Sequence, residues 1–195
     1  MPANYQKGVK MNIFILSDCP KVAAEMMCDK HIVKMPTESM QMISTIMELY
    51  GFSAPMKPVM LNHPCTIWAR ESSNNFGFLV DHCLALCKEY TARYGKKHKV
   101  ETYLEEYEIA ITDTEYFLKT NSGSLRTPFA QAMPDKYKNE DAVKAYRDYY
   151  LGDKWEIATW KLGNPKWWPN DHIEIKKQEM IDAFNKRFNA GVKNE

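Results

Sequence analysis

The segment Cys28-Asp29-Lys30-His31-Ile32-Val33-Lys34-Met35-Pro36-Thr37-Glu38 places ionisable groups along one side of an otherwise apolar stretch. In a helix that turns about 100° per residue, His31 and Glu38 lie about 20° apart, with Lys34 between them. An apolar set with helical spacing follows another face of the same helix; its members are Val33, Met40, Ile43 and Met47. The stretch therefore predicts a helix that packs on one side and carries a stripe of ionisable groups on another.

The polar stripe has two interpretations. A carboxylate flanked by an imidazole and an ammonium group is suited to acid–base catalysis, because its neighbours set its pKa and hold its orientation. The same spacing also fits a solvent-exposed ion pair between Lys34 and Glu38, four residues apart. We take Glu38, His31 and Lys34 as candidate catalytic residues, and the pattern alone leaves the surface ion pair open.

The residues before the stripe predict how its helix begins. The apolar run Met11–Leu16 fits either a buried strand or a first helical turn. Asp18-Cys19-Pro20 offers an N-cap with proline at the first helical position, and Gly51 ends the helix after about Tyr50. Pro36 either kinks this helix or begins a second one.

Most of the remaining chain also has helical periodicity. Further helices are expected over residues 75–94, 100–119, 141–160 and 172–189, with loops at 51–64 and at the Ser/Gly-rich segment 120–128. Cys83 and Cys87 fall on the apolar face of the 75–94 helix, which indicates core positions. Strand signals are scarce. We predict one mostly α, compact helical catalytic domain over residues 11–195, preceded by a loose extension at 1–10.

Composition limits the class of protein. The 195 residues are 45% hydrophobic and 12% aromatic, which is enough for the core of one domain. The absence of a signal peptide and of a run of about 18 apolar residues predicts a cytoplasmic protein with no membrane partner. Five cysteines fit reduced thiols. The net charge of +1 argues against a uniformly basic nucleic-acid binder, but leaves room for a local basic patch around Lys96 and Lys97.

Several classes of site lack their sequence signatures. Cys28 and His31 have the spacing of two helical zinc ligands, but no paired CxxC or HxxxH element completes a site. Motifs of nucleophile elbows, phosphate loops and dinucleotide-binding turns are also missing from the sequence. We expect no metal and no cofactor. The adjacent Trp167 and Trp168 either stack on bases or cap a hydrophobic seam.

Several blocks together resemble a known family. Asp29-Lys30-His31 with Glu38, then Asn62-His63-Pro64, then Tyr90-Thr91-Ala92-Arg93-Tyr94-Gly95 resemble the pyrimidine dimer DNA glycosylases of the phage endonuclease V type. The resemblance covers roughly Met11 to Gly95, with an echo at Asn164-Pro165-Lys166-Trp167-Trp168. The pattern is also similar to a set of phage and bacterial proteins of the same group, for which the location would be the host cytoplasm.

The resemblance implies a compact helical enzyme that flips a nucleotide, attacks the sugar C1′ with an amine to form a Schiff base, and uses a glutamate in strand cleavage. By position, Glu38 is the catalytic carboxylate and His31 the histidine near the DNA backbone. Two positions depart from the family, since Thr37 and Gln41 stand where it has arginines. The amine stays open: Met11, Pro2, Lys30 and Lys34 are the candidates.

The resulting expectation is a monomeric glycosylase and AP lyase that acts on damaged or modified pyrimidines in double-stranded DNA. Two alternatives remain: a phage enzyme that modifies DNA bases or processes nucleotides, and a non-enzymatic DNA-binding protein. The residues expected to contact DNA are Lys30, Asn62, His63, Arg70, Arg93, Lys96, Lys97, Trp167 and Trp168.

Overall fold

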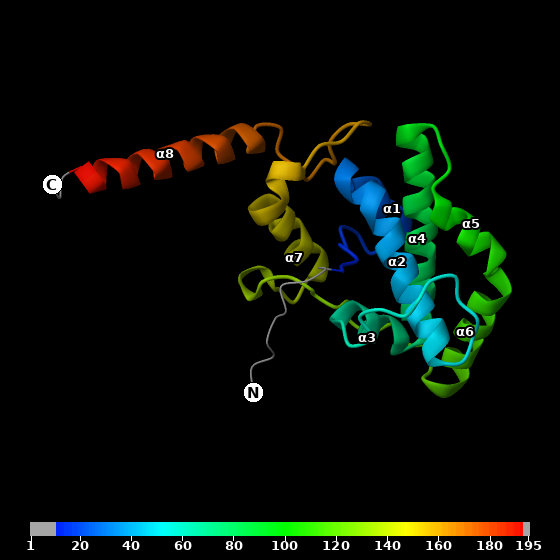
Figure 1. The fold of residues 1–195 in the computed structure, drawn as a ribbon. Coiled ribbons are helices and arrows are strands. Elements are labelled where there is room, and N and C mark those ends of the chain that lie inside the picture. Colours follow the sequence, from blue (N-terminus) through cyan, green and yellow to red (C-terminus); the bar gives the residue numbers. More distant parts are fainter. Residues whose placement is uncertain (1–10, 193–195) are drawn as a thin grey trace.

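Two long helices, α2 (Asp29–Leu49) and α4 (Ser73–Tyr94), pack against each other in the middle of the molecule (Figure 1). They run antiparallel, because Arg93 near the end of α4 pairs with Asp29 at the start of α2 at 3.0 Å. The computed structural model describes the backbone of residues 11–192 and the side chains of residues 11–187; the predicted extension at 1–10 lies outside the described residues.

All regular secondary structure in residues 11–192 is helical, which confirms the mostly α prediction. The other elements are α1 (Pro20–Met26), α3 (Pro64–Arg70), α5 (Lys99–Glu106), α6 (Glu108–Asn121), η1 (Asp135–Tyr137), α7 (Ala142–Tyr149), η2 (Tyr150–Lys154), η3 (Trp155–Ile157) and α8 (His172–Val192).

The helix predicted from Pro20 to Tyr50 is two helices, separated at Met27 and Cys28, which have extended backbone. A helix end leaves carbonyl groups without partners, and here distant side chains bind them. Arg93 donates to the carbonyls of Glu25 and Met27 at 3.0 and 2.8 Å, and the Trp160 indole donates to that of Met26 at 2.9 Å. The chain can therefore break at this point.

Helix α2 itself runs uninterrupted through Pro36, so a second helix does not begin there. The predicted packing face is correct for Met40, Ile43 and Met47, which are fully buried, whereas Val33 is 47% exposed. The buried face packs on α4, where Cys83 and Cys87 are core residues as predicted.

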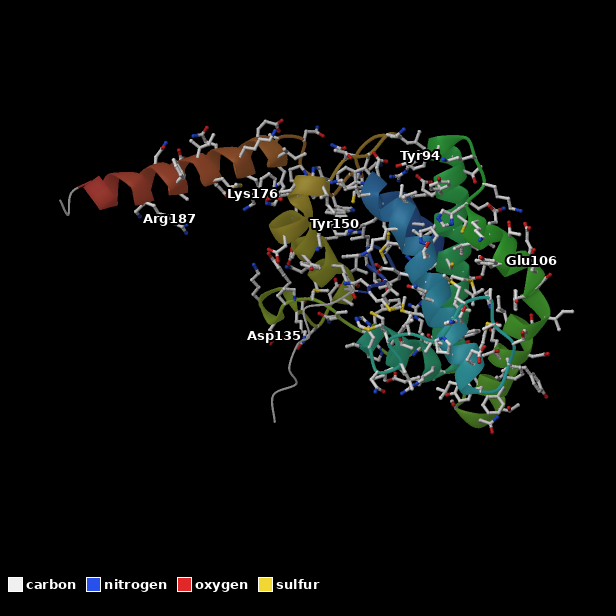
Figure 2. All side chains as sticks on the ribbon, viewed as in Figure 1. Tyr94, Glu106, Asp135, Tyr150, Lys176 and Arg187 are labelled. Carbon is white, nitrogen blue, oxygen red and sulfur yellow. The ribbon has the colours of Figure 1, made fainter. Side chains whose placement is uncertain are left out.

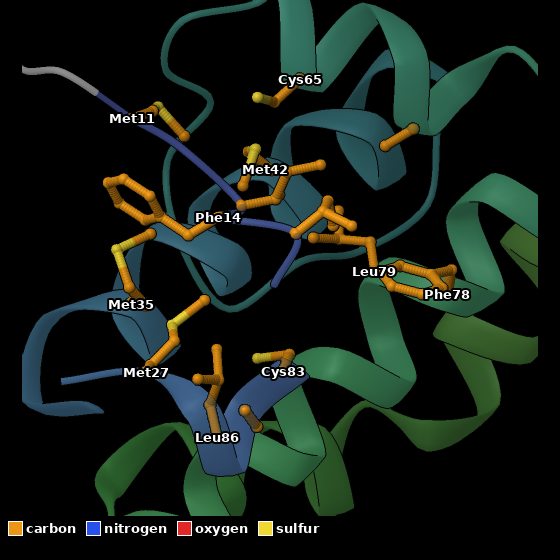
Figure 3. Packing of buried hydrophobic residues seen from close by; sticks show 14 of the residues in the cluster. Met11, Phe14, Met27, Met35, Met42, Cys65, Phe78, Leu79, Cys83 and Leu86 are labelled. Atoms are coloured by element: carbon orange, nitrogen blue, oxygen red, sulfur yellow. The ribbon is translucent and has the colours of Figure 1, made fainter. Parts of the chain in front are cut away.

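The segment Met11–Leu16 is neither a strand nor a helical turn, but a buried irregular strip between α2 and α7 (Figure 1). Figure 3 shows Met11 and Phe14 among Met35, Met42 and Cys65 in the hydrophobic core. The strip therefore lies against the helix that carries the ionisable stripe.

Two other predicted helices are also interrupted. The 100–119 helix is divided at Tyr107 into α5 and α6, and the 141–160 helix changes after Tyr149 into the π-helical η2 and the 3₁₀-helical η3. At Gly152 the Tyr137 hydroxyl lies so close that an added Cβ would be 2.0 Å from it. Only glycine allows this contact, which packs the irregular turn on η1.

The corner between α3 and α4 holds the loop after α6. The side-chain Nδ2 of Asn75 donates to the Trp68 carbonyl and to Thr127 Oγ1, each at 2.7 Å. The Thr127 backbone amide donates to Asn75 Oδ1 at 3.0 Å. The Ser72 hydroxyl accepts from the Asn75 amide and caps α4. Asn75 thus joins α3, α4 and the loop after α6.

Helix α8 extends away from the rest of the described chain, and Arg187 lies on its outer part (Figure 2). Its first turn is attached by a hydrogen bond between His172 Nε2 and the Leu151 carbonyl, 2.8 Å apart. Among the described residues no helix has the length and apolar character needed to cross a membrane.

Candidate active site

Glu38 lies in the middle of α2 with its carboxyl group buried between two nitrogens. Its side chain is 4% exposed; Oε1 lies 2.6 Å from Lys34 Nζ, and Oε2 accepts a 3.2 Å hydrogen bond from the Asn12 backbone amide. Burial raises the pKa of Glu38, while Lys34 and the Asn12 amide act in the opposite direction. A carboxyl group held between two nitrogen donors is placed to give or accept a proton.

The Asn12 side chain fixes the position of its own backbone nitrogen. Its Oδ1 accepts from the amides of Ile13 and Phe14 at 2.8 and 3.2 Å, and its Nδ2 donates to the Ala132 carbonyl at 2.8 Å. Phe14 then has a φ of 42°, which is rare for a residue with a side chain. This tight turn directs the Asn12 nitrogen toward Glu38.

His31 is buried one turn before Lys34 and does not pair with Glu38. Its ring stacks on Phe14 with centroids 4.2 Å apart, and the Tyr150 hydroxyl is hydrogen bonded to Nδ1. Burial first, and then the charges of Lys154 and Lys34, lower the pKa of His31 to about 3, while burial raises that of Tyr150. At neutral pH the uncharged His31 imidazole therefore accepts a hydrogen bond from the Tyr150 hydroxyl. Tyr150 is labelled in Figure 2.

The first turn of α3 carries a buried thiol whose pKa is affected by the Glu38 charge. Cys65 is buried there, and burial together with the nearby charge of Glu38 raises the pKa of its thiol to about 12. The thiol stays protonated and is a poor nucleophile. His63 precedes it as the N-cap of α3, and its Nδ1 accepts from the Cys65 amide at 3.2 Å.

These residues combine a buried carboxyl group with a fixed N-terminal strip and a neutral histidine. Residues 11–102 match the family model of pyrimidine dimer DNA glycosylases. The match begins at Met11, next to the nitrogen that contacts Glu38, and it confirms the resemblance over nearly half of the chain. The searches of curated proteins and of solved structures gave no match.

The predicted DNA-contacting residues do not form one group. Lys30 is exposed on α2, one turn before Lys34. Arg70 is partly exposed and donates to the Leu61 carbonyl at 3.3 Å. Lys96 is exposed, and Lys97 pairs with Glu105 at 2.7 Å. Asn62 is exposed just before the His63 cap.

Arg93 is buried, and its guanidinium group binds other residues of the protein. Its side chain is 1% exposed, and besides the carbonyls at the end of α1 it pairs with Asp29 and Glu89 at 3.0 and 2.7 Å. Each guanidinium nitrogen thus has a partner within the protein. Arg93 connects α1, α2 and α4.

The two tryptophans differ in exposure. Trp168 is 3% exposed and contacts the rings of Trp160 and His172, each 4.9 Å away, which fits the capping of a seam. Trp167 is partly exposed, and the Arg147 guanidinium lies 5.5 Å from its ring centroid. Trp167 is thus the one of the pair that has an accessible surface.

Sequence reasoning missed Asn12, Phe14, Tyr150 and Lys154 as neighbours of the stripe. Asn12 and Phe14 belong to an apolar run without periodicity, and Tyr150 lies where a helix becomes irregular. The one available signal was the abundance of aromatic residues between 141 and 160.

Proposed function

We propose that the protein is a DNA glycosylase with AP lyase activity that acts on damaged or modified pyrimidines in duplex DNA. The observation that carries the proposal is the buried Glu38 carboxyl group with two nitrogens at 2.6 and 3.2 Å, within the segment that matches the glycosylase family. A carboxyl group beside an amine is what imine chemistry at a sugar carbon requires.

Lys34 is the proposed nucleophile when residues 1–11 precede Asn12 in the chain. The Asn12 nitrogen is an amide there and cannot attack carbon, whereas Lys34 Nζ is a primary amine whose side chain is 59% exposed, so a nucleotide can reach it. The alternative is a chain whose first residue is Asn12, in which the α-amine would lie beside Glu38. Both amines would lie beside the Glu38 carboxyl group. The two candidates can be told apart by the peptide that carries the covalent adduct.

The chemistry follows from these groups. The unprotonated amine attacks C1′, the bond from C1′ to the base breaks, and the base leaves with a proton. Glu38 in its protonated form gives a proton to the ring oxygen as the sugar opens, which leaves an imine. The resulting carboxylate then takes a C2′ proton, the 3′ phosphate is eliminated, and hydrolysis of the imine restores the amine.

The test uses duplexes that contain either a cyclobutane pyrimidine dimer or an abasic site. We expect glycosidic cleavage and strand scission, and borohydride should trap a covalent adduct in the presence of EDTA. Mass spectrometry of the digested adduct then locates the amine. Lys34→Arg keeps the charge but removes the nucleophile, and Lys30→Arg, one turn away, is the matched control.

The outcomes separate the rival functions. An adduct on Lys34 supports the mechanism as stated, and one on Asn12 moves the nucleophile to a new N-terminus. A nucleoside of changed mass without base release indicates a base-modifying enzyme. Binding with no reaction on either duplex would leave a DNA-binding protein and contradict the proposal.

A further inference from the structure

Three consecutive apolar side chains face solvent at the end of the loop between α2 and α3. Val59 is 36% exposed, and Met60 and Leu61 are each 39% exposed. Single exposed apolar residues are common, but three in sequence on a loop near a candidate active site call for a binding partner. We call residues 59–61 the apolar tip.

Each residue of the apolar tip has a backbone hydrogen bond to another part of the protein. The Val59 amide donates to Thr45 Oγ1 at 2.9 Å, and its carbonyl lies 3.0 Å from the same oxygen. The Met60 carbonyl accepts from the His63 amide at 2.9 Å, and Arg70 binds the Leu61 carbonyl. Met60 has a φ of 54°, a strained value for a non-glycine residue. The fold thus keeps these side chains outward at a conformational cost.

The backbone of Val59, in the apolar tip, contacts α2 at Thr45, on the side of the helix that carries Glu38. Thr45, which holds Val59, follows Glu38 by seven residues, so the two point about 20° apart and lie about 10.5 Å apart along the helix axis. That separation equals about three base-pair steps of 3.4 Å. A duplex aligned with α2 and presenting a nucleotide to Glu38 would bring the tip about three base pairs from it.

Cationic side chains flank the apolar tip in the sequence, and the nearest carboxylates in sequence are Glu48 and Glu71. Residues 55–70 contain Lys57 and Arg70 and no aspartate or glutamate. Lys57 is exposed and Arg70 partly exposed, on either side of the tip in sequence. Two cations flanking an apolar point are suited to hold phosphates while the point enters the base stack.

We propose that the apolar tip is a wedge that inserts between base pairs of duplex DNA and unstacks them about three steps from the nucleotide at Glu38. The proposal rests on the proposed function, because it needs a DNA substrate at that carboxyl group. Apolar side chains that enter a base step kink the duplex, and a kink lowers the barrier to extruding a nucleotide nearby.

The experiment measures unstacking directly with 2-aminopurine, whose fluorescence rises when it leaves the stack. A duplex with a reduced abasic analogue carries the probe one to six base pairs away, on either side in separate duplexes. We expect the largest rise about three steps from the analogue with the wild-type chain. Met60→Ser/Leu61→Ser should lower that rise at least twofold at saturating protein.

The matched control is Leu125→Ser, since Leu125 is also an apolar loop residue and is 82% exposed. It should behave as the wild type. Equal unfolding midpoints of the three chains exclude misfolding as the cause of a lost signal.

Each result decides something. A double variant that saturates the duplex and keeps the full rise overturns the wedge. A wild type that releases base but gives no rise at any position overturns the wedge alone, whereas a wild type that neither binds nor cleaves any duplex overturns the proposed function as well. A change in oligomeric state with unchanged unstacking would make the tip a contact between copies of this chain, and the wedge would be wrong.

Discussion

The carboxyl group of Glu38 is buried beside the Lys34 ammonium and the Asn12 amide, and we propose it as the group that transfers protons. Glu38→Gln nearly preserves its shape but removes the charge and the transferable proton, so we expect strand cleavage to fall by at least 100-fold, in the range of about 10²–10⁴ typical of lost acid–base catalysis. Gel analysis of abasic duplex measures this. Glu48→Gln, at an exposed position of the same helix, should leave the rate unchanged; an active Glu38→Gln chain would contradict the assignment.

The same carboxyl group predicts how stability depends on pH. Its pKa in the folded chain is raised above 4.5, so the folded state binds more protons than the unfolded state above that pH. Its contribution is complete below pH 4.5 and is lost as the pH rises through the folded pKa. Urea unfolding of Glu38→Gln should lack this loss; identical pH profiles for the variant and the wild type would refute the expectation.

His31 acts in the opposite direction. Its pKa falls from 6.5 in the unfolded chain to about 3 in the fold, so the unfolded state takes up a proton first as the pH drops. The stabilisation is complete above pH 6.5 and is lost as the pH falls toward 3, by at most about 5 kcal/mol. His31→Gln should flatten the acid side of a urea-unfolding profile. A histidine NMR titration that finds His31 protonated at pH 6 would contradict this.

At the scale of elements, the α3–α4 corner predicts a stability effect. Asn75→Ala removes three hydrogen bonds from a side chain with no exposed surface and leaves buried partners unsatisfied, which should cost about 2–3 kcal/mol. Chemical unfolding measures the loss. Asn74→Ala, at the exposed adjacent position, is the control and should change stability by less than about 0.5 kcal/mol.

The elements also show what the sequence could predict. Helix α4 was predictable from its apolar residues at helical spacing, and α8 from its position after the helix-breaking segment Gly163-Asn164-Pro165. The break between α1 and α2 was not, because the groups that bind the free carbonyls, Arg93 and Trp160, are distant in sequence. The contact of Lys34 with Glu38 follows from helical spacing. The approach of Asn12 and Tyr150 depends on tertiary packing of segments without periodicity.

At the scale of the whole molecule, a net charge of +1 means that DNA binding depends on local charge. Each phosphate contact should lower log affinity by about 0.9 per unit of log salt concentration. We expect Lys30→Gln to reduce that slope by about 0.9, because Lys30 is exposed beside the stripe. Lys97 is already paired with Glu105, so Lys97→Gln should change it less. Affinities measured across a salt series test this, and an unaltered slope for Lys30→Gln would remove Lys30 from the interface.

The aromatic residues of α7 and η2 affect whether the family-matched segment could be transferred to another protein by recombination. Tyr146 and Tyr150 come from outside the family-matched segment, yet both are fully buried against it. A gene fragment that encodes only residues 11–102 would encode His31, Lys34 and Glu38 but not the buried rings of Tyr146 and Tyr150. The family-matched segment therefore depends on later residues for part of its packing, and a recombination that moved it alone would leave Phe14 and His31 without the Tyr146 and Tyr150 rings that they contact.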